Sequence, residues 1–279
     1  MNNGVQPILQ FDSVTVDFDA GPVVEDVSFV VLPGECRVIL GAAGSGKTVL
    51  LKTALGLVRP ASGRVWLFGD DITNLSEERL FQIRARVGML FQEGALFDSQ
   101  TVEENVAYPL LSRISSPTRQ QITDVEARVL ESLKFVELGH TIEKYPSELS
   151  GGMRRRVGIA RATVTEPPLV LYDSPTAGLD PITANTIMAL VAKERDTRNT
   201  STVIVTHRYQ DGQLMANFRF DPRIGPNGES GGHLVPDDHT RVGHKTIFMV
   251  MRDGKLVFEG SQSELENSAD PYLHKFVRR

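Results

Sequence analysis

Short apolar runs alternate with helix-like stretches along most of the chain. The apolar runs that predict strands are residues 9–16, 27–31, 37–40, 65–68, 87–91, 169–172 and 202–206. The stretches that predict helices are residues 49–57, 122–136, 153–164 and 181–196. Strands that alternate with helices in this way indicate an α/β fold.

Two helix starts in the middle of the chain carry capping signals. Thr101 and Glu104 form a capping box, in which each side chain accepts a hydrogen bond from the other residue's backbone N–H group. Ser116 before Pro117 predicts a second start, with the serine as cap and the proline at the first helical position. We interpret two apolar stripes in the following helices as core packing: Ile122, Val125, Val129, Leu133 and Val136, then Met153, Val157, Ala160 and Val164.

The last quarter of the chain changes character. Residues 220–244 are rich in glycine, proline, aspartate and histidine without a sustained period, so we expect a long loop or a partly disordered insertion. Asp253-Gly254 lies between the apolar runs 246–251 and 255–258 and predicts a β-hairpin, because both residues accept the positive φ of a tight turn. A short tail ends the chain.

Composition and charge narrow the function classes. The chain has 279 residues, 41% of them hydrophobic, which is enough to bury the core of one large domain or two modest ones. Its net charge of −5 provides no basic field that would favour nucleic acid as the main partner. The single cysteine, Cys36, excludes an internal disulfide and a multi-cysteine zinc site and fits a reducing compartment.

The sequence also bears on membranes. No apolar stretch approaches the roughly 18–20 residues that span a bilayer. A signal peptide would have a basic start and a long apolar core, and residues 1–11 have neither. We therefore expect a cytoplasmic protein that serves a membrane process only by docking to another chain.

A glycine-rich loop follows the strand predicted over residues 37–40. It matches the phosphate-binding P-loop, and the residues that we assign to nucleotide binding are Gly41, Ala42, Ala43, Gly44, Ser45, Gly46, Lys47, Thr48 and Val49. The glycines let backbone N–H groups surround phosphate oxygens, and the following helix adds its positive N-terminal end. Lys47 can then reach the β- and γ-phosphates, and the Thr48 hydroxyl can bind Mg²⁺.

A carboxylate that could share this Mg²⁺ follows a buried strand. The apolar run 169–172 ends on Asp173. Because parallel strands of such folds present ligand groups at their carboxyl ends, Asp173 is predicted to lie at the same edge as the P-loop. An aspartate after a strand is often only a turn residue. Because the chain also has a P-loop, we interpret Asp173 as a Mg²⁺ ligand.

With these motifs in place, the chain resembles the ATPases of the ATP-binding-cassette (ABC) family over nearly its full length. The segment that carries the resemblance is the family's signature motif: Leu149, Ser150, Gly151, Gly152 and Met153. Further matches are the Q-loop glutamine, the D-loop aspartate and the switch histidine: Gln92, Asp180 and His207. Phe18 stands where the family places an aromatic that stacks on adenine, although a strand-edge core residue is an equally direct interpretation.

The resemblance implies a fold and a composite site. The fold is a RecA-like P-loop NTPase core with an antiparallel β subdomain and an inserted helical subdomain over about residues 93–165. This ABC ATPase domain spans residues 1–260 and is followed by a tail over 261–279. In this family two chains close head-to-tail, so that the signature residues of each copy complete the other's P-loop site and the D-loop lies at the interface between them. The residues implied in catalysis are Lys47, Gln92, Ser174 and His207, and those implied in Mg²⁺ binding are Thr48, Gln92 and Asp173.

Two stretches narrow the resemblance. Residues 88–98 and 101–106 are similar to the ATPases of mammalian-cell-entry (MCE) lipid transporters, as are Met153 and the tail after Asp270. Such ATPases act on the cytoplasmic face of the inner membrane, where they energise an integral permease that works with MCE-domain lipid carriers. The resemblance thus implies phospholipid transport, with residues 92–105 in contact with a coupling helix of the permease.

One position departs from the family pattern. ABC ATPases carry glutamate directly after the Mg²⁺-binding aspartate, and here that position is Ser174. A hydroxyl is not basic near neutral pH, and a general base commonly contributes about 10²–10⁴-fold in rate. We expect slow hydrolysis that depends on positioning and charge, and the alternative is a nucleotide-gated clamp or sensor that does not hydrolyse ATP.

A second departure is an insertion over about residues 208–245. It contains His233, His239 and His244 beside Asp237 and Asp238, which are metal-ligand types at a spacing that matches no closed site. A solvated loop, a contact for a partner or regulator, and a metal site all stay open. The other rival function is a soluble ABC protein that acts on nucleic acid or ribosomes. Three features count against it: the single cassette, the acidic charge and the lack of heptads.

Overall fold

The computed structural model describes residues 5–19, 21–92, 94–112, 114–223, 232–237 and 245–277. A six-stranded sheet in the order β12-β11-β3-β8-β7-β6 lies at its centre. The parallel strands of this sheet are β3 (Cys36–Gly41), β6 (Val87–Leu90), β7 (Leu169–Asp173), β8 (Ser201–Thr206) and β11 (Thr246–Arg252). Their carboxyl ends therefore meet at one edge of the sheet. The last strand, β12 (Lys255–Gly260), pairs antiparallel with β11 through the predicted hairpin.

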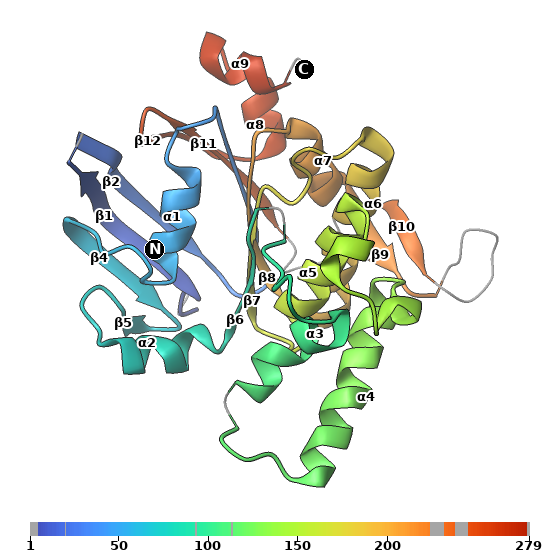
Figure 1. The fold of residues 1–279 in the computed structure, drawn as a ribbon. Coiled ribbons are helices and arrows are strands. Elements are labelled where there is room, and N and C mark those ends of the chain that lie inside the picture. The colour runs from blue at the N-terminus through green and yellow to red at the C-terminus, as the bar shows by residue number, and fades with distance from the viewer. Residues whose placement is uncertain are drawn as a thin grey trace.

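A second, antiparallel sheet lies beside the first, as Figure 1 shows. Its strands are β1 (Leu9–Phe18), β2 (Gly21–Val31), β4 (Ser62–Leu67) and β5 (Asp70–Asp71). Helices α1 (Lys47–Ala54) and α2 (Glu77–Arg84) lie close to it. The rings of Phe11 and Phe29 stack at 4.8 Å between centroids within the core that this sheet shares with the central one.

The parallel strands are buried on both faces because side chains alternate across them. Val38 and Leu40 of β3 pack toward the helices, whereas Ile39 packs toward the antiparallel sheet. Helix α6 (Pro181–Arg198) supplies much of the first of these layers. This double burial is the reason why these strands are uninterrupted apolar runs in the sequence, and the predicted α/β fold with a helical insertion is confirmed.

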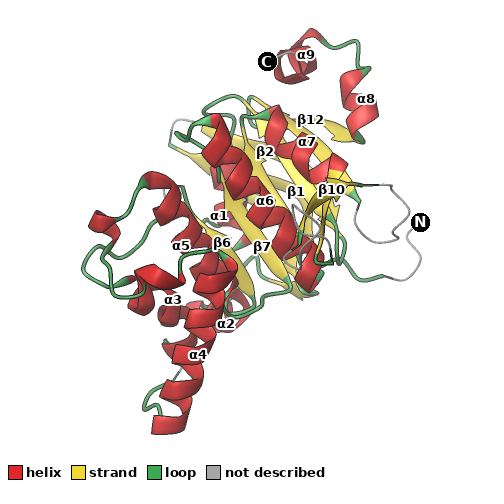
Figure 2. Ribbon diagram, turned by 90° about the vertical axis from the view of Figure 1, so that its right-hand side faces the viewer, coloured by secondary structure: helices red, strands yellow, loops and turns green. Residues whose placement is uncertain are grey.

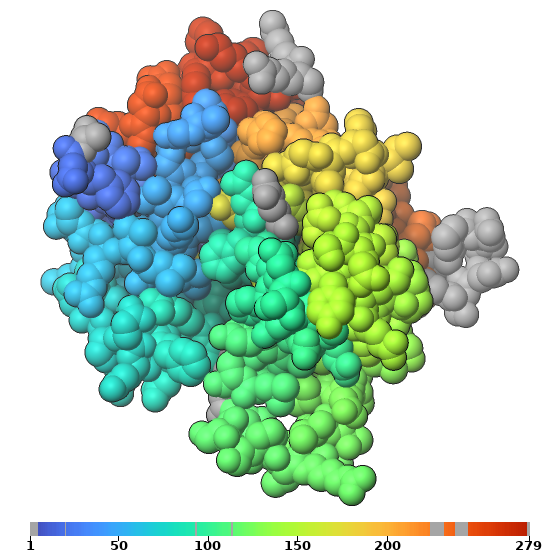
Figure 3. All heavy atoms as spheres, viewed as in Figure 1, coloured from blue at the N-terminus to red at the C-terminus, as the bar shows by residue number. Residues whose placement is uncertain are grey.

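Three helices form a lobe that we call the helical lobe: α3 (Val102–Leu111), α4 (Arg119–Phe135) and α5 (Gly151–Thr163). Helix α4 extends farthest from the sheets (Figure 2), and in the space-filling view the lobe projects from the body of the molecule (Figure 3). The capping box of α3 is present as predicted, since Thr101 Oγ1 accepts from Glu104 N at 3.2 Å and Glu104 Oε2 accepts from Thr101 N at 2.8 Å.

Two details of α4 correct the sequence prediction. Its cap is Thr118, not Ser116, because Thr118 and Gln121 form a reciprocal capping box that Ser116 has no equivalent residue to make. Ile122 of the predicted core stripe is 42% exposed, since the first turns of α4 extend beyond the body of the protein. Val129, Leu133 and Val136 farther along are buried as predicted.

The segment after His207 is also more ordered than predicted. Helix α7 (Tyr209–Asn217) leads into β9 (Phe218–Asp221), which pairs antiparallel with β10 (His233–Pro236). The sequence prediction of an unstructured segment over 220–244 was therefore wrong for these two strands. The tail contains α8 (Gln262–Glu266) and α9 (Pro271–Val277), whose Leu265, Leu273 and Phe276 are buried in the core.

Candidate nucleotide site

The P-loop leaves β3 at the edge where the parallel strands end. Gly44 and Gly46 adopt left-handed φ values of 77° and 94°, which turn the chain back into α1. At Gly46 an added Cβ would lie 2.5 Å from the carbonyl oxygen of Val23, so only glycine fits there. The predicted strand–loop–helix context is thus present, and the N-terminus of α1 opens directly behind the loop.

Lys47 bridges the two sides of this loop. Its Nζ donates to the carbonyl oxygens of Gly41 at 2.9 Å and Ala42 at 2.7 Å, and to Ser45 Oγ at 3.2 Å. Burial lowers the pKa of Lys47, and the nearby carboxylate of Asp173 opposes that shift. The Lys47 ammonium thus gives its hydrogen bonds to three oxygens of the loop. Phosphate oxygens could accept these bonds in their place, so the loop suits an anion.

Around Lys47 lies a cavity of about 730 Å³, within the size range of small-molecule sites. The predicted site residues that line it are Gly41, Ala42, Ala43, Gly44, Ser45, Gly46, Lys47, Thr48, Val49, Gln92, Ser174 and His207. The cavity is also lined by residues that the sequence analysis did not assign to nucleotide binding: Val23, Ala177, Tyr272, Lys275 and Phe276. Residues from six separate segments of the chain therefore meet at one edge of the sheet.

Asp173 ends β7, is 2% exposed and lies close enough to Lys47 to act on its charge. Its Oδ1 accepts from Ser174 Oγ at 3.1 Å. Ser174 itself has a left-handed φ of 49°, and its N–H donates to the carbonyl oxygen of Val205 on β8. The strained turn places the residue after the aspartate at the cavity wall, in the position where the sequence comparison with the ABC family expects a general base.

The switch side of the cavity depends on a network that the sequence did not reveal. Asp211 Oδ2 accepts from the hydroxyls of Thr176 at 2.6 Å and Thr206 at 2.7 Å, and all three residues are buried. Burial raises the pKa of Asp211, which the two hydroxyl donors oppose. The network joins the segment after Ser174 to the residue before His207.

Replacing Asp211 with alanine is expected to lower the free energy of unfolding by about 3 kcal/mol, because two buried hydroxyls lose their acceptor. Asp211→Asn keeps an acceptor and should cost less than half as much. Urea denaturation of the two variants measures both values. Equal losses for alanine and asparagine would contradict the assigned role of the carboxylate oxygen.

The signature segment lies on a different surface. Ser150 caps α5, with its Oγ accepting from Met153 N at 3.2 Å. Gly151 lines a second cavity, of about 580 Å³, whose wall includes Gln92 and Ala177 but not Lys47. Asp180 caps α6 by accepting from the N–H groups of Ile182 and Thr183 at 3.0 Å each. Gly151 of the signature thus lies near Leu179 of the D-loop, and Lys47 does not line the cavity that they share.

Two further predicted positions lie outside these cavities. Phe18 ends β1 with 48% of its surface exposed and does not line the cavity around Lys47. His233 belongs to β10, whereas His239, His244 and Asp238 lie outside the described residues. Among the residues that the structure describes, no three histidine, cysteine, aspartate or glutamate side chains gather as metal ligands would, and no helix is long and apolar enough to cross a membrane.

Comparison with known proteins places the chain in a family. The family model described as ABC transporter matches residues 24–177. A probable ribonucleotide transport ATP-binding protein, mkl, of Mycobacterium tuberculosis is 38% identical over 199 residues, which are 71% of this chain and 54% of the relative. The methionine import ATP-binding protein MetN of Carboxydothermus hydrogenoformans is 45% identical over 184 residues, which are 66% of this chain and 53% of that relative. The chain therefore spans a little more than half the length of these curated relatives.

Solved structures agree with this placement. The dimeric ATP-binding cassette MJ0796, in a post-hydrolysis state bound to ADP and Pi, superposes with a TM-score of 0.73 at 27% identity and covers 91% of this chain and 98% of that one. CbiO1 of Clostridium perfringens, part of the ABC transporter complex cbiONQ, gives 0.71 at 25% identity, with 97% and 92% covered. The chain belongs to the ABC transporter family and shares the fold of these solved ATP-binding cassettes.

Proposed function

We propose that this chain is the subunit that hydrolyses ATP for a membrane transporter, and that two copies close head-to-tail around the nucleotide. The observation that carries the proposal is the separation of the two motifs. Lys47 and Gly151 line different cavities, although Gln92 and Ala177 border both, and we infer that the signature motif that meets a phosphate on Lys47 belongs to a second copy. The dimeric state of the similar cassette MJ0796 supports this arrangement.

In the closed pair, the N-terminus of α5 would face the γ-phosphate on the partner's P-loop. The first N–H groups of a helix lack partners within it, and those of Gly151 and Gly152 point from this end. The Ser150 hydroxyl stands beside them. Because ATP contacts both copies, it favours the closed pair, and release of phosphate after hydrolysis removes that preference.

The residues at the cavity also suit Mg²⁺, the metal that the proposal requires. The Thr48 hydroxyl, the Gln92 amide and the Asp173 carboxylate are oxygen donors, which this hard cation prefers. The Asp173 carboxylate is buried near the Lys47 ammonium, and a bound Mg²⁺ would add to the positive charge that stabilises it there. Bound Mg²⁺ would neutralise charge on the β- and γ-phosphates, while Lys47 holds them and Gln92 and His207 border the reacting end.

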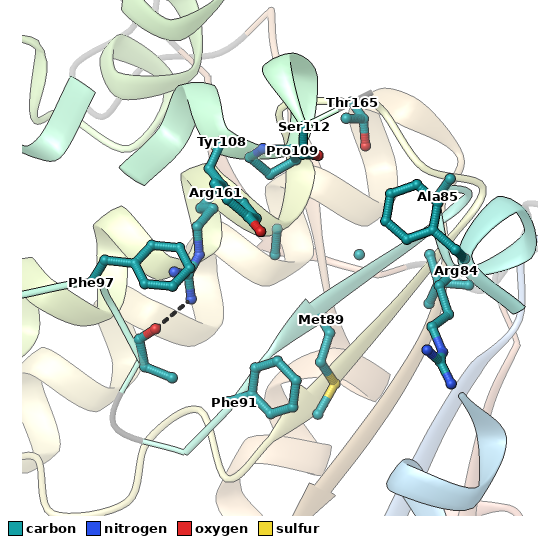
Figure 4. A pocket seen from close by; sticks show the side chains of 15 residues that line it. Arg84, Ala85, Met89, Phe91, Phe97, Tyr108, Pro109, Ser112, Arg161 and Thr165 are labelled. Carbon is teal, nitrogen blue, oxygen red and sulfur yellow. Dashed lines mark hydrogen bonds between the residues drawn. The ribbon is translucent and has the colours of Figure 1, made fainter. Parts of the chain in front are cut away.

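We further propose that the permease docks in a groove beside the Q-loop, drawn in Figure 4. This groove of about 480 Å³ runs between α2, β6 and the helical lobe. Its exposed aromatic residues are Phe81, Phe97 and Tyr108, and Arg161 Nη2 at its wall donates to the carbonyl oxygens of Gly94 and Ala95 at 2.8 and 2.9 Å. Apolar rings beside a cation suit an amphipathic helix of the permease. The hydrogen bonds from Arg161 would connect the position of that helix to the loop that carries Gln92.

Phe97→Ala is expected to weaken permease binding roughly 10- to 30-fold, the usual effect of losing an aromatic anchor. The matched control is Phe218→Ala, since Phe218 on β9 is 39% exposed against 40% for Phe97 and lies outside the groove. Affinity of the purified chain for the permease in detergent measures the effect. Equal affinities for the two variants would contradict the docking surface, while nucleotide binding should stay unchanged in both.

We infer that the cargo is phospholipid and that the complex, with MCE-domain carriers, works at the cytoplasmic face of the inner membrane. Support comes from residues 88–98 and 101–106, which line or flank the groove and are similar to those of lipid-transport ATPases. The curated relatives are named for ribonucleotide transport and methionine import, which are the competing cargoes.

The test of the cargo is isolation of the native complex through this chain, followed by mass spectrometry of the bound small molecules. Phospholipid at a stoichiometric level, released by ATP in the wild type and retained in Lys47→Ala, is the expected result. Methionine or ribonucleotide in its place would overturn the lipid assignment. Phosphate release by the same complex, with Lys47→Ala as the blank, separates a slow ATPase from a clamp that does not turn over.

A further inference from the structure

Helix α9 forms part of the wall of the nucleotide cavity. Tyr272, Lys275 and Phe276 line the same hollow as Lys47 and the glycines of the P-loop, although more than 200 residues of sequence separate them. The tail after Asp270 is similar to the MCE ATPases, but that resemblance assigns no nucleotide-binding residue to this helix. Phe18, the aromatic expected at the nucleotide, is not among the residues that line the cavity.

The helix is fixed in this position by packing and hydrogen bonds. Leu273 and Phe276 are 3% and 9% exposed, and Phe276 meets the ring of Tyr272 edge-on at 5.4 Å between centroids. Tyr272 Oη donates to the carbonyl oxygen of Met251, at the carboxyl end of β11, at 3.1 Å. Asp270 accepts from Tyr272 N at 2.7 Å and so fixes the first turn.

On this fixed helix, Lys275 is exposed and lines the cavity. Its Nζ lies 5.8 Å from the centroid of the Tyr272 ring, and the Arg252 guanidinium lies 5.3 Å from the same ring. Within the described residues Lys275 makes no ion pair. The similarly exposed Lys255, by contrast, has its Nζ 2.9 Å from Glu25 Oε1. A cation without a carboxylate partner at the wall of a polyphosphate site is available to the phosphate charge.

We propose that Lys275 is a nucleotide-binding residue, a second cation that α9 contributes to the polyphosphate of ATP beside Lys47. Tyr272 positions it: the ring contact and the bond to Met251 hold the turn of helix from which Lys275 extends. This assignment concerns ATP binding by the purified chain, and it stands whichever cargo the transporter carries.

The test is equilibrium binding of a fluorescent ATP analogue and of adenosine to the full chain. Lys275→Gln is expected to weaken ATP binding roughly tenfold, as loss of a charge-assisted contact does, and Lys275→Arg to keep most of it. Adenosine, which has no phosphate, should bind equally to all forms. The loss should shrink at high salt, because an exposed cation is screened.

Lys144→Gln is the matched control, since Lys144 is exposed between α4 and α5 and does not line the cavity. Unchanged ATP affinity in Lys275→Gln would overturn the proposal. Tighter ATP binding would overturn it as well, because α9 would then obstruct the site. An equal loss for adenosine and ATP would show that the substitution disturbs the wall of the cavity and not a phosphate contact.

Discussion

Replacing Ser174 with glutamate is expected to raise ATP turnover by roughly 10²-fold, the lower end of what a positioned general base contributes. Ser174 follows buried Asp173 and borders the same cavity as Lys47. Its hydroxyl donates to Asp173 and has no basicity near neutral pH. A glutamate here would place a carboxylate in the cavity, and the neighbouring charge of Asp173 would raise its pKa toward that of an effective base.

The matched control is Ser174→Gln, which has the length of glutamate without its basicity. Phosphate release by the purified complex at saturating ATP measures both variants against Lys47→Ala. We expect the glutamine variant to stay at the slow rate of the wild type. Equal rates for glutamate and glutamine would show that a missing base does not limit turnover in this chain.

Replacing Ser150 with aspartate is expected to lower ATP turnover at least about 10²-fold, since a carboxylate would face the γ-phosphate of the partner's site. The fold should survive, because aspartate caps a helix as well as serine does and can accept the same bond from Met153 N. ATP binding to the isolated chain should also survive, because Ser150 does not line the cavity around Lys47.

Ser150→Asn provides the control for this substitution, as asparagine caps equally well and carries no charge. It should retain most of the turnover of the wild type. Circular dichroism and ATP affinity should agree among all three forms. Full turnover in the aspartate variant would show that the signature segment never meets the γ-phosphate.

The fold and the P-loop surroundings could be predicted because their signals are local. The strand, the glycines and Lys47 follow one another within a dozen residues, and the double burial of β7 produces an apolar run that ends on Asp173. The same locality gave the α3 capping box at Thr101. Where a signal depends only on neighbours in sequence, pattern and structure agree.

The missed features depend on contacts between distant segments. Asp211 joins Thr176 and Thr206, and α9 reaches the P-loop cavity from the end of the chain. Strands β9 and β10 pair across residues whose composition predicts a loop. The start of α4 was misplaced for a different reason, because Ser116 and Thr118 both satisfy the local cap rule and only Thr118 has a reciprocal partner.

The composite site is tested most directly by mixing two inactive variants, Lys47→Ala and Ser150→Asp, in equal amounts with the permease. In a head-to-tail dimer each mixed pair has one site with an intact P-loop and an intact signature, so turnover should return to about a quarter of the wild-type rate. A chain that carries both substitutions should stay inactive on its own. A mixture that remains as inactive as its two components would contradict the claim that two copies share each ATP.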